Sequence, residues 1–199
     1  MENAKKAVKT QYDINGVIAG IKKLGALKPG AEDGYRFLLM KLQDSGKITR
    51  ADAQAYALET VYWETDRTMQ PIKEYDNKAK TYLKGKKYWP YIGMGYSMLT
   101  WEDNYRKFGD ALGVDLITHP EKAMEPEIAW QILEEGMTDM NLGFKDPEFT
   151  KYTLEQFFNE DTIDFYNARK IINPKDYSTF KPIGDRARKV WEVLEANRI

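Results

Sequence analysis

Apolar residues recur at helical spacing through much of the chain. Between residues 35 and 42 they lie three or four positions apart, which predicts one amphipathic helix that ends near Ser45. A second helix is predicted after residues 49–52, whose Thr-x-x-Asp pattern has the spacing of a capping box. Its apolar positions continue from Ala53 to Val61, so Glu64 is expected near the C-terminal end of this helix.

The second half of the chain carries the same helical pattern. Residues 100–103 repeat the capping spacing and predict a helix that runs toward Gly109 or Gly113. Three more helices are expected at 126–140, at 161–173 where Pro174 ends the pattern, and at 183–197. The last of these should bury one face, made of Ala187, Val190, Trp191 and Leu194.

Two segments do not follow the helical pattern. Residues 88–99 are aromatic and interrupted by glycine, and they form the one convincing β candidate, a small hairpin or extended turn. Pro71 and the lysine-rich stretch from 73 to 87 predict an exposed loop beside whatever Glu64 faces. The apolar run at 14–21 is broken by polar and glycine positions and is too short for a signal peptide or a membrane span.

These elements favour a mainly helical fold with a small β component. The sequence contains no repeat, low-complexity tract or linker, so residues 1–199 are expected to form one domain. Residues 1–12 are expected to be an N-terminal tail or a short helix. The prediction is a two-lobed α+β unit in which one small β-hairpin region borders a cleft.

Composition excludes several classes of function. Thirty Lys and Arg residues stand against 31 Asp and Glu, so nothing except a short basic run at Lys5, Lys6 and Lys9 favours nucleic acid. The absence of cysteine fits synthesis in a reducing cytoplasm, and an action on a cell wall would need another factor to release the protein. The single histidine, His119, excludes a histidine pair or a His-rich metal site. No phosphate-binding loop is present, so we expect neither a metal nor a cofactor.

Two glutamates could serve glycoside hydrolysis, which needs a carboxylic acid and a second carboxylate that attacks or activates water. Glu64 follows Val61, Tyr62 and Trp63, apolar surroundings that favour a protonated acid. Glu74 lies in the predicted loop, which could fold back and place it across a cleft with room for one water. That arrangement would invert the configuration of the sugar.

Each glutamate also has a simpler explanation. Glu64 could be a solvated residue on a helix surface, and Glu74 a loop residue paired with Lys73 or Lys78. Asp66 and Glu59 are nearby rivals for the catalytic acid. Glu59 precedes Glu64 by five positions, which places it on a different sector of the helix.

An ordered series of motifs resembles a known family. The segments are 57–65 (ALETVYWET), 68–71 (TMQP), 91–101 (YIGMGYSMLTW) with 104–105 (NY), 112–116 (LGVDL), 120–121 (PE) and 167–173 (NARKIIN). Together they resemble the glycoside hydrolase family 19 chitinases, and more closely the short phage endolysins with the same lysozyme-like fold. The resemblance covers roughly residues 30–197.

The resemblance assigns roles to individual residues. It implies that Glu64 is the proton donor and Glu74 the base that activates water. Thr100 and Asn104 would hold that water and line the site. The residues that it places against substrate or water are Tyr91, Thr100, Asn104, Arg169 and Asn173.

Three positions depart from the family pattern: Trp63 replaces a histidine, Met94 an arginine and Met98 a glutamine. The prediction is an inverting endolysin-type muramidase that acts as a monomer on the glycan strand of bacterial peptidoglycan. A chitinase is one alternative. The three apolar replacements leave open another, a catalytically inactive lysozyme-like protein that binds glycan or belongs to a virion.

Overall fold

The computed structural model describes residues 10–75, 82–139, 141–142 and 152–199. These residues form a mainly helical fold, as predicted. The α-helices are α1 (Ile14–Lys23), α2 (Ala31–Asp44), α3 (Ala51–Glu64), α4 (Glu102–Leu112), α5 (Pro126–Thr138) and α6 (Tyr177–Ala196). Short 3-10 helices are η1 (Leu83–Gly85), η2 (Pro120–Met124), η3 (Leu154–Gln156) and η4 (Asn167–Ile171). No helix in these ranges is long and apolar enough to cross a membrane.

The described residues contain one sheet, formed by two short antiparallel strands. Strand β1 (Ile72–Lys73) pairs with β2 (Met94–Gly95), and Ile72 lies opposite Gly95. The β character of residues 88–99 is thus confirmed at β2, and a further bridge joins Met94 to Leu99. Strand β1 was not predicted, because its two residues stand within the lysine-rich segment that suggested an exposed loop.

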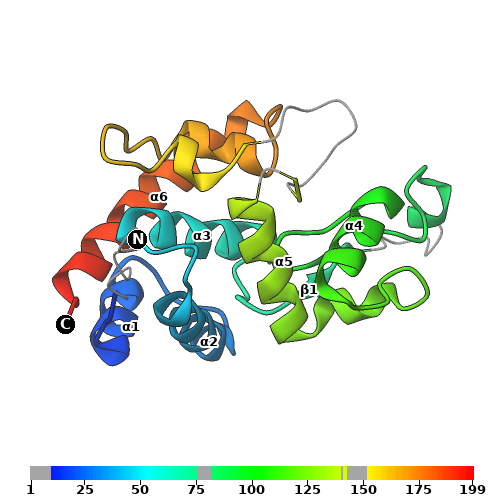
Figure 1. Cartoon of the computed structure of the whole chain (residues 1–199). Helices are drawn as coiled ribbons and strands as arrows, with labels where there is room; N and C mark the ends of the chain where they lie inside the picture. The colour runs from blue at the N-terminus through cyan, green and yellow to red at the C-terminus, as the bar shows by residue number, and fades with distance from the viewer. Residues whose placement is uncertain (1–9, 76–81, 140, 143–151) are drawn as a thin grey trace.

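Helices α3 and α6 form the centre of the fold. Helix α3 is buried at every residue from Ala51 to Val61, and it runs through the middle of the molecule (Figure 1). Helix α6 packs beside it with a face on which Ala187, Val190 and Leu194 are fully buried, as the spacing predicted, while Trp191 of the predicted face is only partly buried. This pair fixes Glu64, the last residue of α3.

The buried apolar side chains separate into two groups. The larger cluster joins α1, α2, α3 and α6. The smaller cluster surrounds Tyr105 and Phe108 of α4 and includes Met94 of β2. Helix α5 belongs to both, because Trp130 contributes to the larger cluster and Ile132 to the smaller, and Figure 1 shows α5 between them. The two-lobed, lysozyme-like prediction is consistent with this arrangement.

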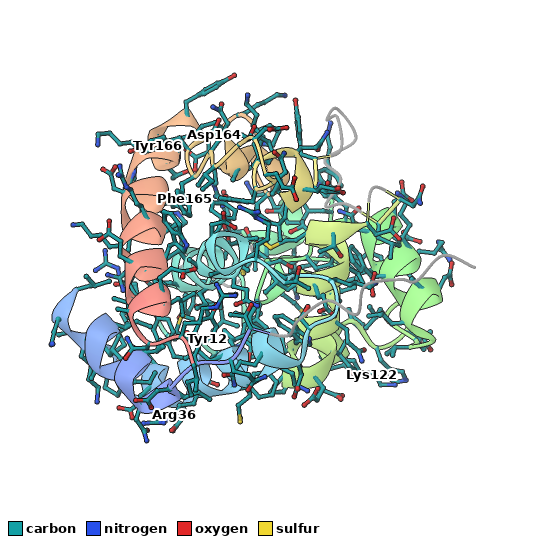
Figure 2. The ribbon with its side chains drawn as sticks, turned by 60° about the vertical axis from the view of Figure 1, so that its left-hand side comes forward. Tyr12, Arg36, Lys122, Asp164, Phe165 and Tyr166 are labelled. Carbon is teal, nitrogen blue, oxygen red and sulfur yellow. The ribbon has the colours of Figure 1, made fainter. Side chains whose placement is uncertain are left out.

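Helix α1 is an element that the sequence pattern did not predict. Its glycines, which interrupt the apolar run, have a packing role: a Cβ at Gly16 would overlap Asn197, and one at Gly20 would overlap Val193. Glycine therefore lets α1 approach the end of α6 closely. In the same region Tyr12, which is buried and labelled in Figure 2, forms a β-bridge with Arg198 near the C-terminus. Of the expected tail or short helix at 1–12, residues 1–9 lie outside the described residues.

The predicted helix at 161–173 is wrong. Only η4 is helical there, because Asp164 accepts hydrogen bonds from the backbone N–H groups of Tyr166 and Asn167 and so stabilises a turn. Figure 2 shows Asp164, Phe165 and Tyr166 beside α6, where Tyr166 contacts Gly184 closely. Helix α6 starts at Tyr177, earlier than predicted, with Pro182 inside it.

Neither predicted capping box forms. Arg50 and Trp101 are the N-cap residues of α3 and α4, and neither caps its helix with a side chain. The hydroxyl of Thr100 donates to the carbonyl of Met98 at 2.7 Å instead. The spacing was present, but the residue in the cap position was one place further along the chain. A capping box does occur at the start of η3, between Thr153 and Gln156.

The turn after Glu64 depends on a glycine in α2. Residues 66, 67 and 69 all have positive φ, and a Cβ at Gly34 would overlap the carbonyl of Met69. We expect Gly34→Ala to lower the free energy of unfolding by about 2 kcal/mol, because backbone must move to admit the methyl group. Urea denaturation measures the change. Gly46→Ala is the control, since no atom lies within 4 Å of its Cβ position; equal stability of both variants would contradict this packing.

Candidate active site

Glu64 is held by a buried arginine. Its side chain is 14% exposed, and its Oε1 accepts a hydrogen bond from Nη1 of Arg169, whose side chain is 4% exposed. Arg169 lies on η4 and also donates from Nε to Thr179 Oγ1 of α6 at 3.1 Å. The expected apolar surroundings of Glu64 are therefore wrong in one respect: a charged partner replaces part of them. Arg169 ties together the end of α3, η4 and α6.

The two rival acids have other partners. Glu59 is 1% exposed, and its Oε2 lies 2.7 Å from Nε of Arg186. Asp66 is exposed and pairs with Lys28 at 2.8 Å. Glu59 and Glu64 thus contact different arginines, as their separation around the helix predicted.

Glu74 follows β1 directly and is fixed at both carboxylate oxygens. Its Oε1 accepts from the Tyr88 hydroxyl at 2.9 Å, and its Oε2 accepts from the Gly93 N–H at 3.3 Å. Its own N–H donates to the Gly93 carbonyl at 2.7 Å. Partial burial and the neighbouring carboxylate raise the pKa of Tyr88 to about 12. The alternative in which Glu74 pairs with Lys73 is not what the structure shows, because its carboxylate bonds to Tyr88 and Gly93 instead. Lys78, the other expected partner, lies outside the described residues.

A cavity of about 310 Å³ is lined in part by Tyr88, the residue whose hydroxyl donates to Glu74. Its size is at the lower end of the range for small-molecule sites, roughly 300–1,000 Å³. Tyr88 packs edge-on against Trp101, with 5.3 Å between ring centroids. The residues that line the cavity are Lys87, Tyr88, Trp89, Tyr91, Trp101, Glu102, Asp103 and Asn104.

Two of the residues that the resemblance assigned to substrate or water line this cavity. They are Tyr91 and Asn104, and Asn104 Nδ2 donates to the Thr100 carbonyl at 2.7 Å. Tyr88 and Trp101 were missed as site residues. The aromatic composition of residues 88–101 was the available signal, but it was interpreted as a hairpin.

The predicted site residues divide between the two clusters. Glu64 and Arg169 belong to elements of the larger cluster, and so does Asn173, an exposed residue whose N–H donates to the Arg169 carbonyl at 2.9 Å. Tyr91, Thr100, Asn104 and Glu74 gather around the smaller cluster. The chain crosses from one cluster to the other between Glu64 and Glu74. In the part of the chain that is described, no group of acidic and histidine side chains could hold a metal ion.

The three positions that depart from the family pattern are placed differently from one another. Trp63 is 39% exposed and lines a second cavity together with Glu59. Met94 is buried in the smaller cluster, so it fills core rather than the aromatic cavity. Met98 packs against Gly93, where its Cε would lie 3.0 Å from an added Cβ.

The fold of this chain is similar to that of a solved structure. No family model matches the sequence, and no curated protein matches it. A solved structure described as a bacterial family 19 chitinase superposes with a TM-score of 0.53, over 91% of this chain and 84% of that chain. The two proteins share a fold. At 15% identity the match supports the chitinase-like, lysozyme-like fold predicted from the motifs, and the activity is a separate question.

Proposed function

We propose that this protein is a glycoside hydrolase that cleaves a polymer of N-acetylated amino sugars, with Glu64 as acid and Glu74 as base. The observation that carries the proposal is the pair of glutamates, each held by its own donors and each supplied by a different cluster. The fold shared with a family 19 chitinase supports it. Most glycoside hydrolases use a pair of carboxylates that flank the scissile bond.

Glu64 would donate its proton through Oε2. Arg169 holds Oε1, and no described residue donates a hydrogen bond to Oε2. The buried Arg169 acts as a positioning residue, because its bond to Thr179 fixes the guanidinium before substrate binds.

Glu74 has the contacts of a base. The Tyr88 hydroxyl and the Gly93 N–H orient its carboxylate, and a water on the far side of the sugar would lose its proton to it. Asn104 lines the aromatic cavity and donates to the carbonyl of Thr100, and the motif resemblance gives both residues the role of holding that water or the sugar. This role predicts an inverting enzyme.

The aromatic cavity would bind a sugar ring. Tyr91 and Trp89 offer flat apolar surfaces on which a sugar ring can stack. The motif resemblance to short phage endolysins favours the peptidoglycan glycan strand as the substrate. Chitin is the alternative that the structural neighbour favours.

The direct test supplies purified peptidoglycan and colloidal chitin to the same preparation. We expect new reducing ends and loss of turbidity with peptidoglycan, and a lower rate with chitin. A second candidate is a glycan-binding protein without activity, which the engagement of Glu64 by a buried arginine favours. Saturable binding to peptidoglycan with no soluble product would support that candidate and contradict the hydrolase.

Tyr88 provides a finer test of the role of Glu74. We expect Tyr88→Phe to lower kcat about fivefold to tenfold, because one hydrogen bond that orients the base is lost while the ring still packs on Trp101. Steady-state release of reducing ends measures the change. Tyr82→Phe is a matched control on an exposed tyrosine, and an equal effect of the two variants would contradict the role of Tyr88.

A further inference from the structure

A second cavity, of about 400 Å³, lies between α3 and α6. It is distinct from the aromatic cavity, with which it shares no residue. Its walls come from the loop after α1, the end of α3, the following turn and the first half of α6. The residues that line it are Leu24, Gly25, Ala26, Glu59, Tyr62, Trp63, Arg67, Pro182, Ile183 and Arg186.

The cavity carries more positive than negative charge. Its one carboxylate, Glu59, is buried and already paired with Nε of Arg186 at 2.7 Å. The Arg186 guanidinium also lies over the Tyr62 ring, 4.1 Å from its centroid, so it is held in a fixed position. Arg67 is exposed, and the neighbouring Asp66 pairs with Lys28 while also attracting Arg67. Among the lining residues, an anion that entered would meet two guanidinium groups and one carboxylate, which already pairs with Arg186.

The burial of Glu59 strengthens the excess of positive charge in the cavity. Loss of solvent raises the pKa of Glu59 to about 7, and this effect outweighs the opposing attraction of Arg186. The carboxyl of Glu59 is therefore a weak competitor for the guanidinium compared with an exposed carboxylate. A ligand anion at Arg186 would meet little repulsion from it.

Trp63 adds a flat apolar surface at the same site. It stands where the family pattern has a histidine next to the catalytic acid, yet its indole is 39% exposed and lines this second cavity. An exposed tryptophan beside two arginines is the kind of surface that binds a ring with a charged substituent.

We propose that this cavity binds an anionic ring compound of monosaccharide size, with its carboxylate or phosphate on Arg67 and Arg186 and its ring on Trp63. The cavity volume lies near the lower end for small-ligand sites, roughly 300–1,000 Å³, which suits one ring rather than a polymer. Guanidinium groups recognise carboxylate and phosphate through paired hydrogen bonds, so both anions share the chemistry. The site does not depend on Glu64 or Glu74.

Isothermal titration calorimetry with the full chain tests the proposal. The probes are glucuronate and glucose 6-phosphate, with glucose as the neutral control and inorganic phosphate as the control without a ring. We expect one site for the charged sugars, no detectable binding of glucose, and weaker binding of inorganic phosphate. Whichever charged sugar binds more tightly identifies the preferred anion.

Three variants separate this site from general charge effects. Arg67→Gln changes an exposed residue and is expected to weaken binding about tenfold. Glu59→Gln keeps an acceptor for Arg186 and is expected to change binding about twofold or less, because Glu59 exerts little repulsion on the ligand anion. Arg188→Gln, on the exposed side of α6, is the matched control and should leave binding unchanged.

Several outcomes would overturn the proposal. These are glucose binding as tightly as glucuronate, inorganic phosphate binding as tightly as either charged sugar (an adventitious ion only), or Arg67→Gln matching Arg188→Gln. Binding and hydrolysis are measured separately. A failure here therefore leaves the proposed hydrolase intact, and a failure of hydrolysis leaves this site intact.

Discussion

Glu64→Gln is expected to reduce glycan hydrolysis at least about 10³-fold, within the range for loss of a general acid. Glutamine keeps the shape of the side chain and an oxygen that can accept from Arg169, but it has no proton to give to a leaving group. The initial rate of reducing-end release at saturating substrate measures the loss.

The matched control for this experiment is Glu192→Gln. Glu192 is exposed on α6 and lines neither cavity, so its replacement removes a negative charge without touching the proposed acid or the proposed sugar site. We expect a change of about twofold or less, because an exposed ion pair such as that with Arg188 contributes little. Comparable losses in the two variants would mean that Glu64 has no special role.

Arg169→Gln is expected to lower the free energy of unfolding by about 3–5 kcal/mol. The substitution leaves the largely buried Glu64 without its cation and Thr179 without its donor, and breaking one side of a buried ion pair has this order of effect. For a chain of this size the melting temperature should fall by about 10 °C. Calorimetry and urea denaturation measure both quantities.

A double-variant cycle separates the pair from other effects of the substitution. The variant that carries both Glu64→Gln and Arg169→Gln should lose less stability than the sum of the two single variants, because the buried charges are removed together. Lys181→Gln on α6 is the control for an exposed ion pair, with an expected change of about 0.5 kcal/mol or less. Additive losses, or a loss below about 1 kcal/mol for Arg169→Gln, would show that the pair contributes little to the fold.

The sequence predicted the fold best where apolar periodicity was regular. Helices α2, α3, α4 and α5 lie within a few residues of their predicted positions, and the buried face of α6 was correct. Helix α1 was missed because Gly16 and Gly20 interrupt its apolar pattern. Glycine is needed at both positions because α6, which lies far away in the sequence, packs closely against them. The capping boxes predicted at residues 49–52 and 100–103 were wrong, because each helix has its N-cap one residue later than the spacing indicated.

The site was predictable only in part, because contacts between residues far apart in the sequence leave no mark on local spacing. Glu64 and Glu74 were selected by their match to family motifs. Without that match, a glutamate at a helix end and another in a loop would both be expected to be solvated. Arg169 was assigned to substrate, whereas the structure places it against Glu64, a contact across 105 positions that no local spacing reveals. Tyr88 was not selected, although it donates to the second glutamate.

Trp63 shows how a departure from a motif can carry information. In the sequence, Trp63 stands where the family pattern has a histidine, so the proposed acid lacks that polar neighbour. In the structure its indole lines a separate cavity with Arg67 and Arg186, which is the basis of the anion site proposed above. The replacement does not fill the aromatic cavity, and neither does the buried Met94.

The most direct test of the central claim is the fate of solvent oxygen during the reaction. Purified peptidoglycan is incubated with the protein in water enriched in oxygen-18, and the soluble fragments are analysed by mass spectrometry. The proposed hydrolase predicts fragments with one heavy oxygen at each new reducing end, and none above background with Glu64→Gln. Fragments without the label, or equal labelled release by the protein and by Glu64→Gln, would contradict it.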